Sequence, residues 1–170
     1  MEKPNQNRSG SIKRGKLFFT IKLPQSGGST FCNWFVQNRP NCVVIGGDDF
    51  RNALYGREFQ IEAEGTVFST MDVAIRALLN RGFDVIIDET STTEATLFRY
   101  YKIDENAKEI WINTTKEECI KRAIENNRRY LVLPIKRMAK QFDFLKKNFK
   151  KIKSKIIDYL NERKIADVPV

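Results

Sequence analysis

The sequence contains no histidine among its 170 residues. This absence excludes Ser-His-Asp and Cys-His arrangements for nucleophilic catalysis, and it excludes any zinc site that uses histidine as a ligand. An acid or base that takes part in a reaction must therefore be a carboxylate, a lysine or a tyrosine.

Cysteines are few, and long apolar runs are missing. The three cysteines, Cys32, Cys42 and Cys119, are odd in number and far apart, which predicts small buried side chains in a reducing compartment rather than a disulfide framework. No apolar run is long enough to span a bilayer, and the first ten residues lack the apolar core of a signal peptide. We therefore expect a cytoplasmic protein with no membrane partner.

The net charge of +9 is distributed unevenly along the chain. Residues 1–16 carry a net charge of +4, residues 17–118 carry −5, and residues 119–170 carry +10. Basic segments at both ends favour a polyanionic partner such as a nucleic acid. A solvated lysine-rich surface without a partner is the alternative interpretation.

The hydrophobic pattern predicts one α/β domain. The polar residues 1–15 are expected to form a basic flexible tail, followed by a single domain over residues 16–170. Within the domain, compact apolar runs alternate with segments of helical periodicity. The predicted strands are residues 17–23, 42–46, 84–88 and 109–113. We expect a three-layer sandwich in which a mostly parallel sheet of four or five strands is covered by helices on both faces.

Local signals predict where several helices begin or end. Gly82 follows a helical pattern and is a candidate C-terminal cap. Ser91 and Thr115 each precede a glutamate by three residues, which is the spacing of a capping box. Pro134 suits the first turn of a further helix.

The first predicted strand leads into KLPQSGGST, residues 22–30, and then into a predicted helix. This segment fits the frame of the phosphate-binding loop G-x-x-x-x-G-K-[ST], with lysine in place of the first glycine and glycine in place of the lysine. Backbone N–H groups at the start of the helix still favour an anion, but the mobile ammonium group of the motif is missing. The predicted nucleotide-binding residues are Lys22, Ser26, Gly27, Gly28, Ser29 and Thr30. A Gly/Ser turn without a ligand is the alternative.

Lys22 is the candidate replacement for the missing ammonium group, because it lies at the other side of the same loop. Its long side chain could reach across the loop to bound phosphates. A lysine at the end of a strand normally extends to solvent instead. The sequence alone does not decide between these two directions.

Acidic residues follow the second and third predicted strands. Asp48 and Asp49 come after residues 42–46, and Asp88 ends residues 84–88. Because parallel strands end at the same edge of a sheet as the loop, these carboxylates could supply a base for a hydroxyl and, at Asp88, a ligand for Mg²⁺. A polar turn that caps a helix is the alternative for the first two. An unpaired buried carboxylate is costly, which favours a functional role for Asp88.

Basic residues surround the turn before Pro134. Lys121, Arg122, Arg128 and Arg129 could form a small lid that brings guanidinium groups over a transferred phosphate. In such a lid, Arg129 is a further candidate for binding the nucleotide.

With these motifs, the chain resembles the kinase domain of phage-type 5′-polynucleotide kinases, within the wider group of P-loop kinases that includes zeta toxins. The resemblance covers about residues 16–140. It depends on FTIKLPQSGGST as strand and loop, GGDDFR as an Asp-Asp-aromatic-Arg element, and KRAIENNRRYLVLPIKRM as lid and following helix. The resemblance implies a P-loop fold and transfer of a phosphoryl group from ATP, with Mg²⁺, to the 5′-hydroxyl of RNA or DNA.

The resemblance also implies roles for individual residues. Asp48 would take the proton from the attacking hydroxyl, and Arg51 would hold the 3′-phosphate of the acceptor. Ser29 would bind Mg²⁺ or the β-phosphate, while Arg122 and Arg128 would clamp the donor phosphates. A structural ion pair with a neighbouring aspartate is the alternative for Arg51.

The C-terminal run FLKKNFKKIKSKIIDYLNERK, residues 144–164, predicts an amphipathic helix. Its lysine face could contact nucleic-acid phosphates, but no base stacking is expected there because the lysine face shows no aromatic residues. A solvated face is the alternative. The residues predicted to pack on the domain are Phe144, Leu145, Phe149, Ile152, Ile156, Ile157 and Leu160.

Two hypotheses on function follow from these patterns. The first is an ATP-dependent kinase that phosphorylates the 5′-hydroxyl of a nucleic acid, or of a nucleoside or another small acceptor. The second is a degenerate P-loop protein that binds a nucleotide or a nucleic acid without transfer.

Overall fold

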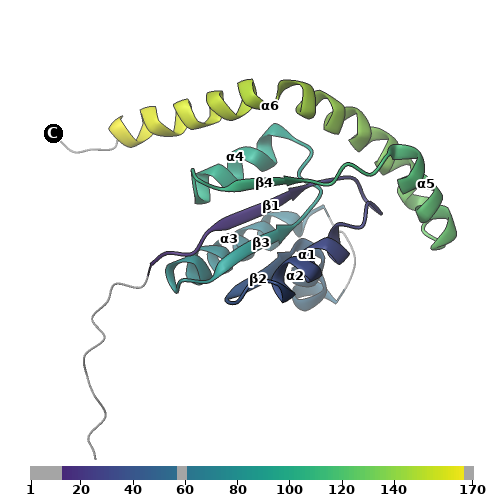
Figure 1. Cartoon of the computed structure of the whole chain (residues 1–170), viewed down its shortest axis with the longest axis horizontal. Coiled ribbons are helices and arrows are strands. Elements are labelled where there is room, and N and C mark those ends of the chain that lie inside the picture. The colour runs from purple at the N-terminus through teal and green to yellow at the C-terminus, as the bar shows by residue number, and fades with distance from the viewer. Residues whose placement is uncertain (1–12, 57–60, 167–170) are drawn as a thin grey trace, which may run out of the picture.

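The computed structural model describes residues 13–56 and 61–166 (Figure 1). Most of the predicted tail over residues 1–15 lies outside the described residues. The predicted domain over residues 16–170 contains every element of the fold described below.

The described residues form one sheet of four strands, and every neighbouring pair is parallel. The strands are β1 (Leu17–Ile21), β2 (Cys42–Gly46), β3 (Asp84–Asp88) and β4 (Lys108–Trp111), in the order β2-β3-β1-β4. All five residues of the central strand β1 are buried, which explains why its sequence is a continuous apolar run rather than an alternating one. The predicted parallel α/β sheet is confirmed.

Helices connect the strands and cover both faces of the sheet (Figure 1). They are α1 (Gly28–Gln37), α2 (Gly47–Tyr55), α3 (Glu64–Asn80), α4 (Glu94–Ile103), α5 (Lys116–Glu125), the short 3-10 helix η1 (Arg129–Leu131) and α6 (Val132–Ala166). On one face, Cys32 and Phe35 of α1 pack against Phe18 and Ile86 of the sheet. On the other face, α3, α4, α5 and α6 enclose the larger core.

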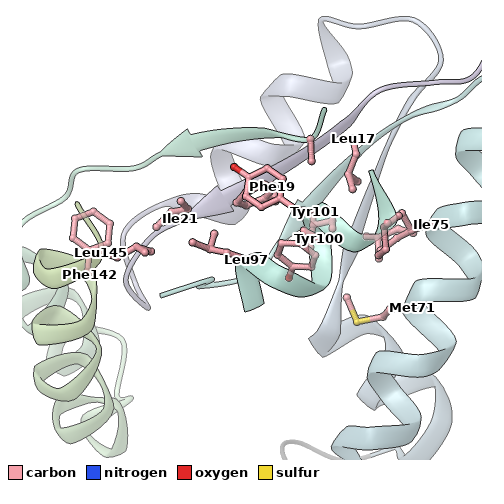
Figure 2. Close-up of a cluster of buried hydrophobic side chains, with 14 of the residues drawn as sticks. Leu17, Phe19, Ile21, Met71, Ile75, Leu97, Tyr100, Tyr101, Phe142 and Leu145 are labelled. Atoms are coloured by element: carbon pink, nitrogen blue, oxygen red, sulfur yellow. The ribbon is translucent and has the colours of Figure 1, made fainter. Parts of the chain in front are cut away.

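The larger core is built around aromatic side chains from β1 and α4. Figure 2 shows Phe19 beside Tyr100 and Tyr101, with ring centroids separated by 5.0 and 5.7 Å. Met71 and Ile75 of α3 are fully buried in the same cluster. This packing fixes the sheet against α3 and α4, and it therefore holds the carboxyl ends of β1 and β3 in a defined position.

Several predicted helix boundaries are observed and one is wrong. Gly82 follows α3 in the left-handed region with φ 86° and donates its N–H to Leu79, as expected of a residue that ends a helix. Thr115 caps α5 by accepting the N–H of Glu118. The predicted cap at Ser91 is wrong, because α4 begins at Glu94 and is capped by Thr93, two residues after Ser91.

The last two predicted helices form a single helix, α6, of 35 residues. Pro134 lies in its first turn, as predicted. The apolar stripe packs against the core through Leu145, Ile152 and Ile156, which are buried. Phe144 does not belong to that stripe, because its position on the helix leaves it 57% exposed.

All three cysteines are free. Cys32 and Cys119 are buried as expected, whereas Cys42 is only partly buried. Among the described residues, no helix is both long enough and apolar enough to cross a membrane.

Candidate active site

The loop between β1 and α1 forms a tight turn at the carboxyl end of the sheet. Gln25 and Gly27 both adopt left-handed backbone conformations, with φ of 63° and 89°. Gly27 precedes the first residue of α1, and no side chain caps this helix. The first N–H groups of a ten-residue helix are therefore directed at the space above the loop, where they favour a bound anion.

Lys22 turns into this loop and passes over Gly28. A Cβ atom at Gly28 would lie 2.5 Å from the Nζ atom of Lys22, 2.6 Å from Cε and closer still to Cδ. No residue with a side chain can therefore occupy position 28 while Lys22 keeps this conformation. The aliphatic part of the lysine fills the space in which the side chain of the usual motif lysine would begin.

The ammonium group of Lys22 ends beside the carboxylate of Asp88, with 2.6 Å between Nζ and Oδ1. Both side chains are almost buried, with exposed fractions of 11% and 14%. The contact has the separation of an ion pair but not the angle of a directed hydrogen bond. The backbone N–H of Lys22 donates to Thr90 at 2.9 Å, which fixes the end of β1 next to the end of β3.

The thiol of Cys32 lies close enough to Lys22 and Asp88 to be affected by the charges of both. Burial raises the pKa of Cys32 to about 12, and the negative charge of Asp88 adds to the rise. The thiol is therefore protonated at neutral pH and does not act as a nucleophile or a metal ligand in that state.

Oxygen ligands suitable for Mg²⁺ lie at the start of α1 and the end of β3. Ser29 and Thr30 are exposed in the first turn of α1, and Asp88 lies at the end of β3. Magnesium bound with a nucleotide usually takes only one or two protein ligands, together with phosphate oxygens and water. A hydroxyl and a carboxylate fit this requirement, and no group of three or more acidic or cysteine side chains suited to a metal occurs among the described residues.

A nearly buried arginine, Arg51, lies among the acidic residues that follow β2. Arg51 forms two hydrogen bonds with Glu64, Nε to Oε1 at 2.7 Å and Nη2 to Oε2 at 2.8 Å. Its Nη1 atom donates to Asp48 Oδ1 at 2.6 Å. The side chain of Arg51 is only 11% exposed, whereas that of Asp48 is 99% exposed. Arg51 thus makes the ion pair with a neighbouring aspartate that the sequence left as an alternative, and it positions one oxygen of a solvent-facing carboxylate.

Glu89 is a further carboxylate at this edge of the sheet. Its Oε1 atom accepts the backbone N–H of Gly47, the first residue of α2, at 2.8 Å. Burial raises the pKa of Glu89, and the positive charge of Arg51 offsets part of the rise. The group links α2 to β3 and therefore sets the position of Asp48 relative to the loop.

The predicted lid arginines occupy different positions. Arg122 of α5 lies against the loop, where its Nη1 atom donates to the carbonyl of Gln25 at 3.4 Å and its Nε atom to Glu118 at 2.9 Å. Arg128 and Arg129 are exposed between α5 and α6, and no hydrogen bond or ion pair joins their side chains to the loop within the described part of the chain. Only the first of the three is positioned beside the phosphate loop in this conformation.

Sequence reasoning missed several residues that hold this site together. Glu64 is the first residue of α3, thirteen positions from Arg51, and nothing in the local pattern indicates their contact. Glu89 follows Asp88 directly at the end of a strand, which is a signal that could have identified it. Thr114 fixes the loop from the far side, because its hydroxyl donates to the carbonyl of Ser26 at 2.8 Å.

Comparisons with known proteins show the fold. No family model and no curated protein sequence matches this chain. A chain from a solved Pnkp1/Rnl/Hen1 RNA repair complex is similar in structure, with a TM-score of 0.72 and 22% identity over 82% of this chain and 48% of that chain. This chain therefore spans about half the length of that relative.

Two smaller kinases also share the fold. The APS kinase CysC of Mycobacterium tuberculosis, solved with AMPPNP and APS, has a TM-score of 0.54 and 18% identity over 67% of this chain and 71% of that chain. The shikimate kinase of Acinetobacter baumannii has a TM-score of 0.53 and 12% identity over 95% of this chain and all of that chain. The chain thus has the fold of P-loop kinases, as its sequence predicted.

Proposed function

We propose that the protein transfers the γ-phosphoryl group of ATP to the 5′-hydroxyl of a nucleic acid. The observation that carries the proposal is the position of Lys22, whose side chain passes over Gly28, the residue that stands in place of the motif lysine. The cost of burying this ammonium group is offset in part by Asp88, and its place at the start of α1 favours a loop that binds anions.

The donor side of the site follows from the loop. The N–H groups at the start of α1 and the ammonium group of Lys22 would bind the β- and γ-phosphates, and Arg122 lies close enough to reach them. Ser29 and Asp88 would hold Mg²⁺, which would neutralise charge on the phosphate oxygens. Lys22 is paired with Asp88 in this structure. Phosphates would offer Lys22 a new partner, and Mg²⁺ would offer one to Asp88.

The acceptor side of the site follows from α2. Asp48 would accept the proton of the attacking hydroxyl, whose oxygen then bonds to the γ-phosphorus while the bond to the β,γ-bridging oxygen breaks. Arg51, held by Glu64, would fix the direction of the Asp48 carboxylate. Its guanidinium group would reach an acceptor phosphate only by leaving one of these carboxylates.

A nucleic acid is the favoured acceptor for two reasons. The chain is basic at both ends, with a net charge of +10 over residues 119–170, and a polymer of phosphates matches that charge better than a small sugar or nucleoside. The fold is similar to that of a chain from an RNA repair complex. A small hydroxyl compound is the other acceptor that an assay must include.

A second candidate function is nucleotide binding without transfer. The observation that favours it is the pairing of both key cations, since Lys22 already faces Asp88 and Arg51 already faces Glu64. A site whose cations remained in these pairs would bind phosphates weakly and would not stabilise a transition state.

The test is transfer of radiolabelled γ-phosphate to oligonucleotides with a 5′-hydroxyl, beside a nucleotide-binding titration. We expect the wild type to transfer phosphate and Lys22→Ala to lose at least about 10²-fold in turnover, the usual effect of removing one group that stabilises transition-state charge. The control is Lys108→Ala. Lys108 is an exposed residue at the amino end of β4, whereas the loop lies at the carboxyl ends of the strands. Adding Gly28→Lys to Lys22→Ala should restore part of the activity. Nucleotide binding with no transfer to any acceptor would support the second function, and full activity of Lys22→Ala would contradict the proposed role of Lys22.

A further inference from the structure

A basic hollow lies on the surface where the middle of α6 meets the end of β4. It has a volume of about 530 Å³ and is separate from the residues of the candidate active site. Trp111 of β4 and Phe149 of α6 line it together with Asn148. Two pairs of lysines on α6 complete the lining, namely Lys146 with Lys147 and Lys150 with Lys151.

The lysines give the hollow an uncompensated positive charge. Lys146 donates to the side-chain oxygen of Asn113 at 2.8 Å. Over the described part of the chain, Lys147, Lys150 and Lys151 form no ion pair, and the lining contains no acidic residue. All four lysines are exposed. A concave surface with this charge attracts polyanions.

The aromatic side chains are held in place by edge-to-face packing. The ring of Trp111 lies 5.4 Å from that of Phe142 and 5.3 Å from that of Phe149, with interplanar angles of 75° and 86°. Trp111 is only half-buried, so part of its ring borders the hollow. The sequence did not suggest base stacking here, because no aromatic residue stands among the lysines of the helix face. The fold brings Trp111 of β4 to them.

The hollow also lies at the same edge of the sheet as the phosphate loop. Trp111 is the last residue of β4, and the next residue, Ile112, donates its N–H to the carbonyl of Ile21 at the end of β1. Two residues further, Thr114 binds the loop through Ser26. A strand of nucleic acid bound in the hollow would therefore be attached to the edge of the domain at which transfer is proposed to occur.

We infer that this hollow binds single-stranded nucleic acid, with the lysines on its phosphates and the ring of Trp111 on a base. Lysines alone would suit any polyanion, including an acidic peptide. The fixed tryptophan among them favours a ligand with flat aromatic groups between its charges, which is the composition of a nucleic-acid strand. This binding requires no transfer reaction, and it would persist in a protein that lacks kinase activity.

The test uses the fluorescence of Trp111 in the full chain. The sequence contains only two tryptophans, so a Trp34→Phe background leaves Trp111 as the single reporter. Titration with a 12-nucleotide oligo(U) or oligo(dT), without ATP, should quench its emission. The logarithm of the binding constant should fall against the logarithm of salt concentration with a slope of about −0.7 for each phosphate contact.

A matched pair of triple variants separates the hollow from the overall charge of the helix. Lys147→Gln, Lys150→Gln and Lys151→Gln together should reduce the salt slope by about 2 and weaken binding. In the control variant, three exposed lysines of α6 that lie outside the hollow are replaced by glutamine, namely Lys136, Lys140 and Lys155. It removes the same charge and should leave the slope nearly unchanged. Thermal unfolding of both variants confirms that they remain folded.

Stacking is tested by Trp111→Leu with fluorescently labelled oligonucleotides. Loss of the ring should weaken binding by roughly 5- to 100-fold, with little change of the salt slope. Polyglutamate is the comparison ligand. The inference would be overturned if the two triple variants had equal effects, or if Trp111→Leu kept its affinity. It would also be overturned if polyglutamate bound as well as the oligonucleotide. Because these titrations contain no ATP, a protein without kinase activity would give the same binding result.

Discussion

The substitution Gly28→Ala tests whether Lys22 occupies the loop. The added Cβ would overlap the last atoms of the Lys22 side chain, which belong to a flexible chain rather than to the backbone. We therefore expect alanine to displace the ammonium group without breaking the turn. The displaced lysine reaches solvent, and Asp88 remains nearly buried without its counter-charge.

The size of the effect follows from this loss. Leaving one partner of a buried ion pair alone costs about 3–5 kcal/mol, and hydration of the released lysine recovers part of this. Alanine at the first residue of α1 stabilises the helix by at most about 1 kcal/mol relative to glycine. Gly28→Ala should therefore lower the free energy of unfolding by about 1–2 kcal/mol in the wild type.

When Lys22 is already absent, Gly28→Ala should raise the free energy of unfolding instead of lowering it. In Lys22→Ala no side chain fills the space above Gly28. Alanine at position 28 then adds its higher helix propensity and displaces no ion pair. The resulting coupling energy of about 2 kcal/mol is measurable by urea unfolding of the four proteins of a double-mutant cycle. Equal effects of Gly28→Ala in both backgrounds would show that Lys22 does not lie over Gly28.

Three further predictions concern the acidic edge of the sheet. Asp48→Asn should lower turnover in the phosphate-transfer assay by ~10²–10⁴-fold with little change in nucleotide affinity, and equal turnover would remove Asp48 from the mechanism. Glu64→Gln should destabilise the fold by about 2–3 kcal/mol in urea, because the nearly buried Arg51 loses its charged partner, and a change below 0.5 kcal/mol would contradict this. Burial raises the pKa of Glu89 above its ordinary 4.5, so wild-type stability should fall as pH rises through the folded-state pKa, whereas Glu89→Gln should not show this loss. Unfolding curves of the two proteins should therefore nearly coincide below pH 4.5 and separate at neutral pH, and a constant difference would refute the assignment.

The sequence predicted β2 and β3 well, whereas β1 ends two residues earlier than the predicted 17–23. Residues 42–46 and 84–88 are observed with the expected bounds, since apolar runs end there at glycine or at charged residues. β4 begins one residue earlier and ends two residues earlier than predicted. Its observed bounds follow its pairing with β1, which runs from Phe18 opposite Lys108 to Ile21 opposite Trp111.

The candidate site was predictable in its residue types but not in its contacts. The loop identified Lys22, Gly28 and Ser29 from spacing alone. The direction of the lysine depends on Asp88, which is 66 positions away, and no periodicity records such a pairing. For Arg51, the pairing with Asp48 was among the alternatives, whereas Glu64 was missed because it is thirteen positions away in the sequence.

The four-stranded sheet ends at β4, and an exposed strand edge is a surface on which another protein chain could add a strand and start aggregation. Here the edge strand has only four residues, begins with Lys108, and is bordered by α6. Lys153 reaches Glu109 at 3.1 Å, and Lys146 reaches Asn113 just beyond the strand. The lysine-rich helix therefore also protects the edge of the sheet, and its positive charges would keep concentrated molecules of this protein apart.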